Sequence, residues 1–266
     1  MLIIGERINA TRKQIGAALK NRDADHIRNE ARQQAAAGAD YLDVNGGSTP
    51  EEEKENMAWL CEEVQSASEL PMCIDSASAE VIREGLRLNR NGRPLVNSIS
   101  MEKGRYEEIL PIVKEQNAMV IALAIDDSGI PQTADDRLKV VERIVGEAEK
   151  NGIALSDVFV DPLVMALSAD GNSGNLVIDV IQGIKQRWPD LKTTSGLSNI
   201  SFGLPNRRLV NRVFLAMLMA HGMDSAIVDP LDEKLMATVF AGRALAGKDE
   251  FCMEYLEAYR AKKLEV

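Results

Sequence analysis

The 266-residue sequence is poor in the side chains on which several common kinds of site depend. It has three cysteines, two histidines and only 4% aromatic residues. Cys61, Cys73 and Cys252 show no C-x-x-C spacing, so the sequence predicts neither a disulfide framework nor a zinc site. Unpaired thiols are typical of a reducing compartment, and we therefore expect a cytoplasmic protein.

Other absences limit the possible partners and reactions. The net charge is -10, without a basic stripe that could displace counterions, so we expect no nucleic-acid partner. The longest apolar run, residues 118–125, is too short to cross a bilayer, and we expect no membrane span. His26 and His221 both fall in predicted helices, which argues against a nucleophilic triad.

Short runs rich in Val, Ile and Leu alternate with longer segments of helical period, which is typical of repeated βα units. Eight strands are predicted, over residues 2–4, 41–44, 72–74, 95–97, 119–124, 158–160, 192–195 and 226–228. We therefore expect an α/β fold, a single (β/α)8 TIM barrel formed by residues 1–266 as one domain. An open doubly wound sheet is the alternative, but no G-x-G-x-x-G turn follows the first run.

In such a barrel, catalytic groups lie where the strands end. The residues that close the runs are almost all carboxylates and primary amides: Glu6, Asn9, Asp43, Asn45, Asp75, Asn97, Asp161, Asn199 and Asp229. A carboxylate accepts hydrogen bonds from amino groups and ring N–H groups, whereas an amide both donates and accepts. The combination indicates a site for a flat heterocycle such as a pterin or a guanine-like edge. Because four of these nine groups are uncharged amides, we predict no bound metal.

Two other roles compete for these residues. An aspartate after a strand often caps the next helix. Locally, capping and binding are equally supported for Asp75, whereas Asp229, followed by Pro230, favours a cap, and Asn199 is a possible cap as well. Asp75 and Asp161 could also be the acid and base of a glycosidase, but so few aromatic residues offer little platform for a sugar.

Six short motifs, in this order, resemble those of the pterin-binding methyltransferases: residues 2–9 (LIIGERIN), 42–45 (LDVN), 73–76 (CIDS), 96–98 (VNS), 160–163 (VDPL) and 196–201 (GLSNIS). The likeness is greatest to the methyltetrahydrofolate:corrinoid protein methyltransferases. The relatives of those enzymes include the folate-binding module of cobalamin-dependent methionine synthase and, more distantly, dihydropteroate synthase. The resemblance covers nearly the whole chain, to about residue 247.

The resemblance implies a pterin site at the strand ends. Asp75, Asn97 and Asp161 match the positions that hydrogen-bond the pterin ring in that family. Asp43 and Asn45 lie on the matching second strand and are expected to support the pocket.

Three further positions follow the seventh strand. Asn199 matches the family's mobile asparagine near pterin N5 and is the expected catalytic residue. Arg207 is expected to reach the ring or the glutamate tail. Phe202 stands in the pocket where acetogen-type relatives have glutamine, as in methionine-synthase-like sequences. Because an apolar ring cannot donate a hydrogen bond, proton delivery to N5 would rest on Asn199 or water.

The implied activity is methyl transfer, in either direction, between N5 of 5-methyltetrahydrofolate or tetrahydrofolate and the cobalt of a corrinoid (cobalamin) on a separate partner protein. The family also implies a homodimer. Two alternatives are a non-catalytic pterin-binding module and an enzyme like dihydropteroate synthase. The second is disfavoured because residues 228–230, Val-Asp-Pro, stand where that enzyme has a basic Ser-x-Arg-x-His-like pattern.

Overall fold

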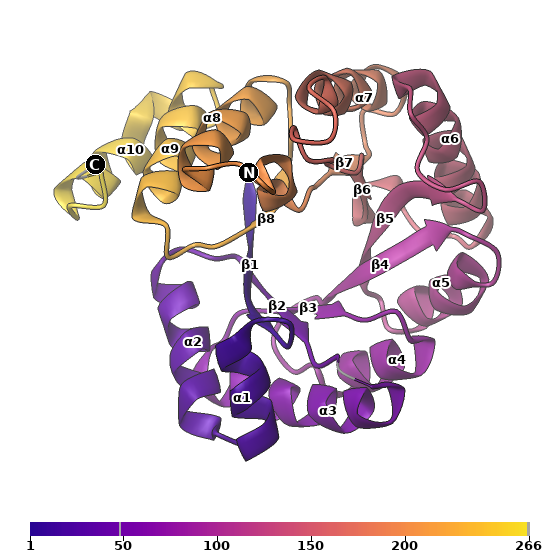
Figure 1. Ribbon diagram of the computed structural model, residues 1–266, viewed down its shortest axis with the longest axis vertical. Coiled ribbons are helices and arrows are strands. Elements are labelled where there is room, and N and C mark those ends of the chain that lie inside the picture. The colour runs from indigo at the N-terminus through magenta and orange to yellow at the C-terminus, as the bar shows by residue number, and fades with distance from the viewer. Residues whose placement is uncertain (48, 265–266) are drawn as a thin grey trace.

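The computed structural model describes residues 1–47 and 49–264, and its eight parallel strands form a barrel surrounded by helices (Figure 1). The strands are β1 (Leu2–Asn9), β2 (Tyr41–Asn45), β3 (Met72–Asp75), β4 (Leu95–Met101), β5 (Met119–Asp126), β6 (Val158–Asp161), β7 (Lys192–Thr193) and β8 (Ser225–Val228). All eight predicted strands are confirmed, and β1 and β4 continue well past their apolar runs.

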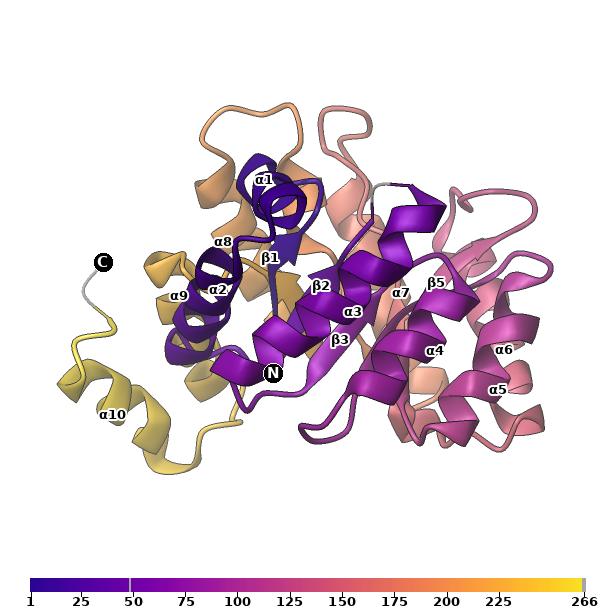
Figure 2. The ribbon, with the colours of Figure 1, turned by 90° about the horizontal axis from the view of Figure 1, so that it is seen from below.

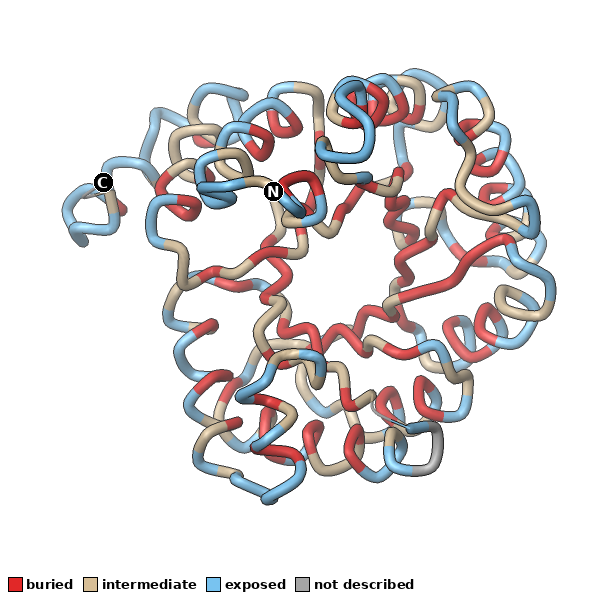
Figure 3. Tube along the Cα trace, in the orientation of Figure 1, coloured by how far each residue is buried: buried red, intermediate tan, exposed pale blue. Residues whose placement is uncertain are grey.

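Helices follow the strands and cover the outside of the barrel, as the side view shows (Figure 2). The α-helices are α1 (Lys13–Asn21), α2 (Ala24–Ala36), α3 (Pro50–Ala67), α4 (Ala79–Leu88), α5 (Arg105–Glu115), α6 (Ala134–Lys150), α7 (Ser173–Arg187), α8 (Arg207–Ala220), α9 (Glu233–Leu245) and α10 (Met253–Arg260). Three 3-10 helices are η1 (Leu155–Asp157), η2 (Leu197–Ser201) and η3 (Glu250–Cys252). Buried residues lie along the strands and on the inner sides of the helices, whereas α10 is mostly exposed (Figure 3).

The strands follow one another around the barrel in sequence order, from β1 to β7, and β1 also pairs with β8. Two hydrogen bonds close the ring between the seventh and eighth strands. Ile227 N donates to Ser195 O at 2.9 Å, and Ser225 Oγ donates to Thr193 O at 3.1 Å. An open doubly wound sheet is therefore wrong for this chain, because its strand order would reverse at the middle of the sheet.

The barrel interior changes from apolar to polar along the strands. Its apolar part is a cluster of buried side chains: Ile4, Cys73, Leu95, Ile121 and Phe159. Side chains two residues apart on a strand point to the same face. Four of these apolar residues are each followed, two positions later on the strand, by a polar residue: Glu6, Asp75, Asn97 and Asp161. The carboxyl-terminal ends of the strands therefore carry a polar layer of side chains next to the apolar cluster.

Candidate functional site

Two carboxylate–amide pairs join the ends of β2, β3 and β4. Asn97 Nδ2 donates to Asp43 Oδ1 at 3.2 Å, and Asn45 Nδ2 donates to Asp75 Oδ2 at 3.0 Å. The structure thus brings together four of the residues predicted for the site. Within the described residues, nothing donates a hydrogen bond to Asp75 Oδ1, so this oxygen is available to a ligand.

Burial gives the two aspartates of these pairs different charges. Burial and the nearby charge on Asp75 together raise the pKa of Asp43 to about 8, against the opposing effect of its hydrogen bonds. Burial also raises the pKa of Asp75, to about 6, against the opposing effect of the Asn45 hydrogen bond. At neutral pH, Asp43 is therefore mostly a neutral acid, and Asp75 is mostly a carboxylate that accepts hydrogen bonds.

Asp161 closes β6 and is held by backbone groups. Its Oδ1 accepts from Leu163 N at 2.7 Å, and its Oδ2 accepts from Gly196 N at 3.4 Å. Burial raises the pKa of Asp161 to about 6. The contact with Gly196 links this carboxylate to the loop that carries Asn199.

Asn199 lies in η2 and is exposed. A Cβ atom built on Gly196 would lie 3.4 Å from Asn199 Nδ2, so the amide sits over the glycine that binds Asp161. No described residue forms a hydrogen bond with this amide. Asn199 is not a helix cap, because α8 begins at Arg207 and its N-cap is Asn206.

Phe202 and Arg207 lie together on the rim of the barrel. The phenyl ring is 67% exposed, and the Arg207 guanidinium carbon lies 5.8 Å from its centroid. Arg207 is held by Ser198 O at 2.8 Å and by Ser201 Oγ at 3.0 Å. The pterin-contact roles predicted for both residues remain predictions.

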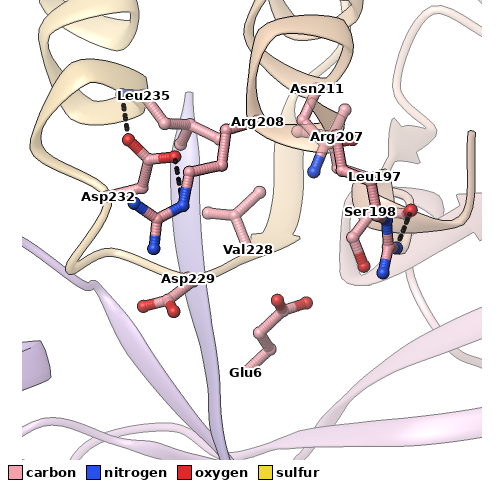
Figure 4. Close-up of a pocket in the computed structure, with 10 residues that line it drawn as sticks. All are labelled: Glu6, Leu197, Ser198, Arg207, Arg208, Asn211, Val228, Asp229, Asp232 and Leu235. Atoms are coloured by element: carbon pink, nitrogen blue, oxygen red, sulfur yellow. Dashed lines mark hydrogen bonds and ion pairs between the residues drawn. The ribbon is translucent and has the colours of Figure 1, made fainter. Parts of the chain in front are cut away.

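A cavity of about 300 Å³ lies beside the rim, between the ends of β1 and β8 and the start of α8 (Figure 4). Figure 4 shows the carboxylates of Glu6 and Asp229 turned toward it, with Ser198 and Arg207 on the far side. The wall therefore carries acidic groups on one side and a guanidinium on the other.

Glu6 was predicted as a strand-end residue, without an individual role. Burial and the charge on Asp229 raise its pKa to about 7, against the opposing charges of three arginines. The sequence signal is the alternation of Leu2, Ile4 and Glu6, which places all three on the barrel-facing side of β1.

The capping role expected for Asp229 is wrong. Asp232 is the N-cap of α9 and accepts from Leu235 N at 3.1 Å. Asp229 instead accepts from Leu231 N at 3.0 Å and from Arg7 Nη1 at 2.9 Å. The side chain thus forms a turn and an ion pair before the helix begins.

Asp75 does not cap the following helix either, because Ser78 is the N-cap of α4 and accepts from Val81 N at 3.4 Å. The sequence supported capping and ligand binding equally for Asp75, and the structure excludes the capping role.

Residues 1–47 and 49–264 contain no group of three or more His, Cys, Asp and Glu side chains placed to hold a metal ion. Within the same residues, no helix is both long enough and apolar enough to span a membrane.

Comparisons with known proteins identify the family of the chain. The family model described as "Pterin binding enzyme" matches residues 5–229. The chain is 39% identical over 266 residues to the methylcorrinoid:tetrahydrofolate methyltransferase of Eubacterium limosum, covering 99% of this chain and 98% of that protein. It is 33% identical over 241 residues to the methionine synthase of Mycobacterium tuberculosis, covering 86% of this chain and 20% of that protein.

Among solved structures, a dihydropteroate synthase from Clostridium difficile, determined in the presence of pteroic acid, superposes with a TM-score of 0.72 at 19% identity. The match covers 92% of this chain and 96% of that one, and it shows the shared barrel fold. The family match and the two sequence relatives confirm the predicted resemblance. The chain belongs to the pterin-binding enzyme family.

Proposed function

We propose that the protein is a methyltransferase that moves a methyl group between N5 of a tetrahydrofolate and the cobalt of a corrinoid carried by a separate protein. The observation that carries this proposal is 39% identity over essentially the full length of both chains to a methylcorrinoid:tetrahydrofolate methyltransferase. The same site can run in either direction, because the methyl donor and the methyl acceptor exchange roles.

The strand-end residues are suited to holding the pterin. Asp75 and Asp161 present carboxylate oxygens that can accept hydrogen bonds from the amino group and ring N–H groups. Asn97 supplies an amide beside them, while Asp43 and Asn45 orient these groups through their mutual bonds. Phe202 and Arg207 would contact the ring or the tail from the rim.

Asn199 is the proposed catalytic amide. An amine nitrogen is a poor leaving group unless the charge that develops on it is stabilised. The free amide of Asn199 can hydrogen-bond N5 more strongly in the transition state than in the ground state, which lowers the barrier. The barrel would otherwise contribute by positioning the reacting methyl group in line with the cobalt.

A spectrophotometric assay tests the proposal. We expect that adding methyltetrahydrofolate and catalytic amounts of the protein to reduced free cobalamin removes the cobalt(I) absorbance. Persistence of that absorbance with every corrinoid, while folate binds, would favour a non-catalytic pterin-binding module. Condensation of a pterin pyrophosphate with p-aminobenzoate would favour a dihydropteroate-synthase-like enzyme instead.

We also propose that the protein is a homodimer formed through α8. Leu209, Val213 and Met217 on this helix are 54%, 53% and 40% exposed, although their spacing is that of a core-facing stripe. They line an apolar groove of about 360 Å³ between α7 and α8. Contiguous exposed apolar surface marks an interaction site, and a second copy would cover it.

Two further expectations are retained as proposals. The first is that residues 1–266 act as a single pterin-binding domain, which is supported by the one continuous barrel. The second is a cytoplasmic location, which is supported by three free thiols, of which Cys61 and Cys73 are buried and Cys252 is exposed.

A further inference from the structure

Two loops at the carboxyl-terminal ends of the strands are bonded to each other and carry exposed apolar side chains. Residues 162–172 connect β6 to α7, and residues 202–206 connect η2 to α8. Together these loops form what we call the loop wall. Figure 2 shows them above the barrel, the loop before α7 in pink and the loop before α8 in orange, whereas α10 lies at the opposite end.

Hydrogen bonds fix the loop wall in place. Leu167 N donates to Ile200 O at 3.0 Å. Ser168 Oγ donates to Phe202 O at 2.7 Å, so the second loop is also bonded to the first. Arg137, which is 1% exposed, donates to two backbone carbonyl oxygens at the start of the first loop. The loop wall is therefore a preformed surface, and a partner that binds it pays little to order it.

The loop wall exposes two large apolar side chains. Phe202 is 67% exposed and Met165 is 37% exposed. Every other exposed large apolar side chain of residues 1–47 and 49–264 lies on α8 or in the segment from Leu245 onward. Large apolar side chains that a rigid backbone holds in solvent are typical anchors of a protein–protein contact.

The start of α8 gives the loop wall a positive edge. Residues 191–223 contain no Asp or Glu, although the net charge of the chain is -10. Among the described residues, Arg207 is held by neutral acceptors and forms no ion pair with a carboxylate. The Arg208 side chain is 77% exposed, and its neighbour Asp232 is already bonded to Arg212 at 2.7 Å. A partner surface that meets this edge is therefore expected to be acidic.

The position of the loop wall indicates which partner binds it. Phe202 follows Asn199 by three positions, and Phe202 N donates to Asn199 O at 3.1 Å. In the proposed reaction, the cobalt must reach a methyl group on N5 beside Asn199, and the corrinoid arrives on a separate protein. A protein that brings a corrinoid to this amide therefore meets the loop wall.

We propose that the loop wall is the docking surface for the corrinoid protein, an inference that rests on the proposed function. Met165 and Phe202 contact an apolar patch beside the corrinoid, and Arg207 and Arg208 face acidic side chains around that patch. Free cobalamin offers no such protein surface. The loop wall thus favours a protein-bound corrinoid over a free one without taking part in the methyl transfer.

The test compares two methyl acceptors at saturating methyltetrahydrofolate: reduced free cobalamin, and the reduced corrinoid protein of the source organism that the wild type methylates. Arg208→Glu and Met165→Glu should each raise the KM for the corrinoid protein roughly tenfold or more, because each places a negative charge against an acidic or apolar surface. Arg208→Gln and Met165→Ala, which add no charge, should raise this KM by less. The folate Kd and the rate with free cobalamin should not change in any of the four variants.

Salt and two matched controls sharpen the test. The wild-type KM for the corrinoid protein should rise with ionic strength, and Arg208→Glu should lose most of this rise. Arg260→Glu and Met253→Glu make the same two changes at exposed positions of α10, at the other end of the molecule. Both controls should match the wild type with either acceptor.

The outcomes separate the two proposals. No methyl transfer by the wild type to either acceptor would overturn the proposed function itself. Transfer to free cobalamin, with the KM for the corrinoid protein unchanged in both loop-wall glutamate variants, would overturn only the docking surface. An equal loss of transfer to free cobalamin in these variants would place the loop wall in the reaction site, and a raised KM in the controls would place docking at α10. Either result, or transfer to free cobalamin but to no corrinoid protein, would also overturn the docking surface.

Discussion

The charges and hydrogen-bond donors around each buried aspartate decide what it can do. Asp43 is 3% exposed and has no cation beside it, so it stays neutral up to about pH 8. Asp75 and Asp161 have backbone or amide donors, and their pKa values of about 6 leave them ionised at pH 7. Three residues of one chemical type thus supply both an acid and two hydrogen-bond acceptors.

Replacing Asp75 tests the pterin contact. Asp75→Asn exchanges one acceptor oxygen for a donor, so methyltetrahydrofolate should bind roughly ten- to a hundredfold more weakly in a calorimetric titration. Wild-type affinity should also decline as pH falls through about 6, because protonation removes the acceptor, whereas the variant should lack this decline. The matched change Asp179→Asn, at an exposed position of α7, should leave binding as it was. Equal affinity of wild type and Asp75→Asn would exclude the contact.

Replacing Asp43 tests the neutral buried acid. The pKa of Asp43 is higher in the folded protein than in the unfolded chain. Between about pH 4 and pH 8 the native state therefore keeps a proton that the unfolded chain has already lost, and the free energy of unfolding falls as pH rises through this window. Asparagine cannot ionise and still accepts from Asn97. Asp43→Asn should therefore gain roughly 1 to 3 kcal/mol of stability relative to the wild type between pH 5 and pH 8.

Urea unfolding at the two pH values measures this difference. Asp25→Asn, whose side chain is 99% exposed in the wild type, should show no such change. A wild type that gains stability between pH 5 and pH 8 relative to Asp43→Asn would contradict the assignment of a neutral Asp43.

The sequence pattern identified most of the candidate site residues, because a polar side chain that follows an apolar run is expected at the end of a strand. The same pattern could not identify the role of Asp229. That role depends on Arg7, which is 222 positions away in the chain and reaches Asp229 only after β8 pairs with β1. The same closure brings Glu6 to the cavity wall.

At the scale of elements, the positions of the strands were predictable and their lengths were not. β1 continues through the polar residues 6–9, with a register irregularity against β2 between Gly5 and Ile8. Hydrophobic periodicity stops at Ile4, but backbone pairing does not require apolar side chains. The outer apolar residues of α8 stay exposed because only part of its apolar stripe packs on the barrel.

The close approach of α4 to β3 provides a test at this scale. A Cβ atom on Gly85 would lie 2.8 Å from Ile74 Cγ2, next to the strand end that carries Asp75. Gly85→Ala should therefore lower the free energy of unfolding by about 1 to 3 kcal/mol in urea titrations. It should also weaken folate binding, because α4 must move away from β3.

Gly146→Ala in α6 is the matched control. No atom lies within 4 Å of the added Cβ there, so the change should raise stability by about 0.5 to 1 kcal/mol through helix propensity alone. Stabilisation by both substitutions would show that α4 does not pack tightly on β3.

For the whole molecule, the barrel separates two surfaces with different tasks. The polar layer lies at the carboxyl-terminal ends of the strands, where the proposed corrinoid partner would approach, and the apolar groove lies between α7 and α8. Figure 1 shows these two helices on the outside of the barrel.

Sedimentation velocity tests the dimer. The wild type should sediment as a dimer, and Val213→Asp should sediment as a folded monomer with an unchanged circular dichroism spectrum, because Val213 is 53% exposed in the single chain. Leu245→Asp, at an 89% exposed position at the end of α9, should remain a dimer. If Leu245→Asp were monomeric and Val213→Asp were dimeric, the dimer interface would lie at the C-terminal helices and not at α8.

The central claim, methyl transfer between folate N5 and cobalt, is tested most directly by following the methyl group itself. The protein would be saturated with methyltetrahydrofolate labelled with ¹³C in the methyl group and mixed with excess reduced cobalamin for one turnover. We predict that about one equivalent of label per site appears on cobalt, with the same amount of tetrahydrofolate formed. Label that stays on the folate while titration shows the site to be filled would contradict the proposed function.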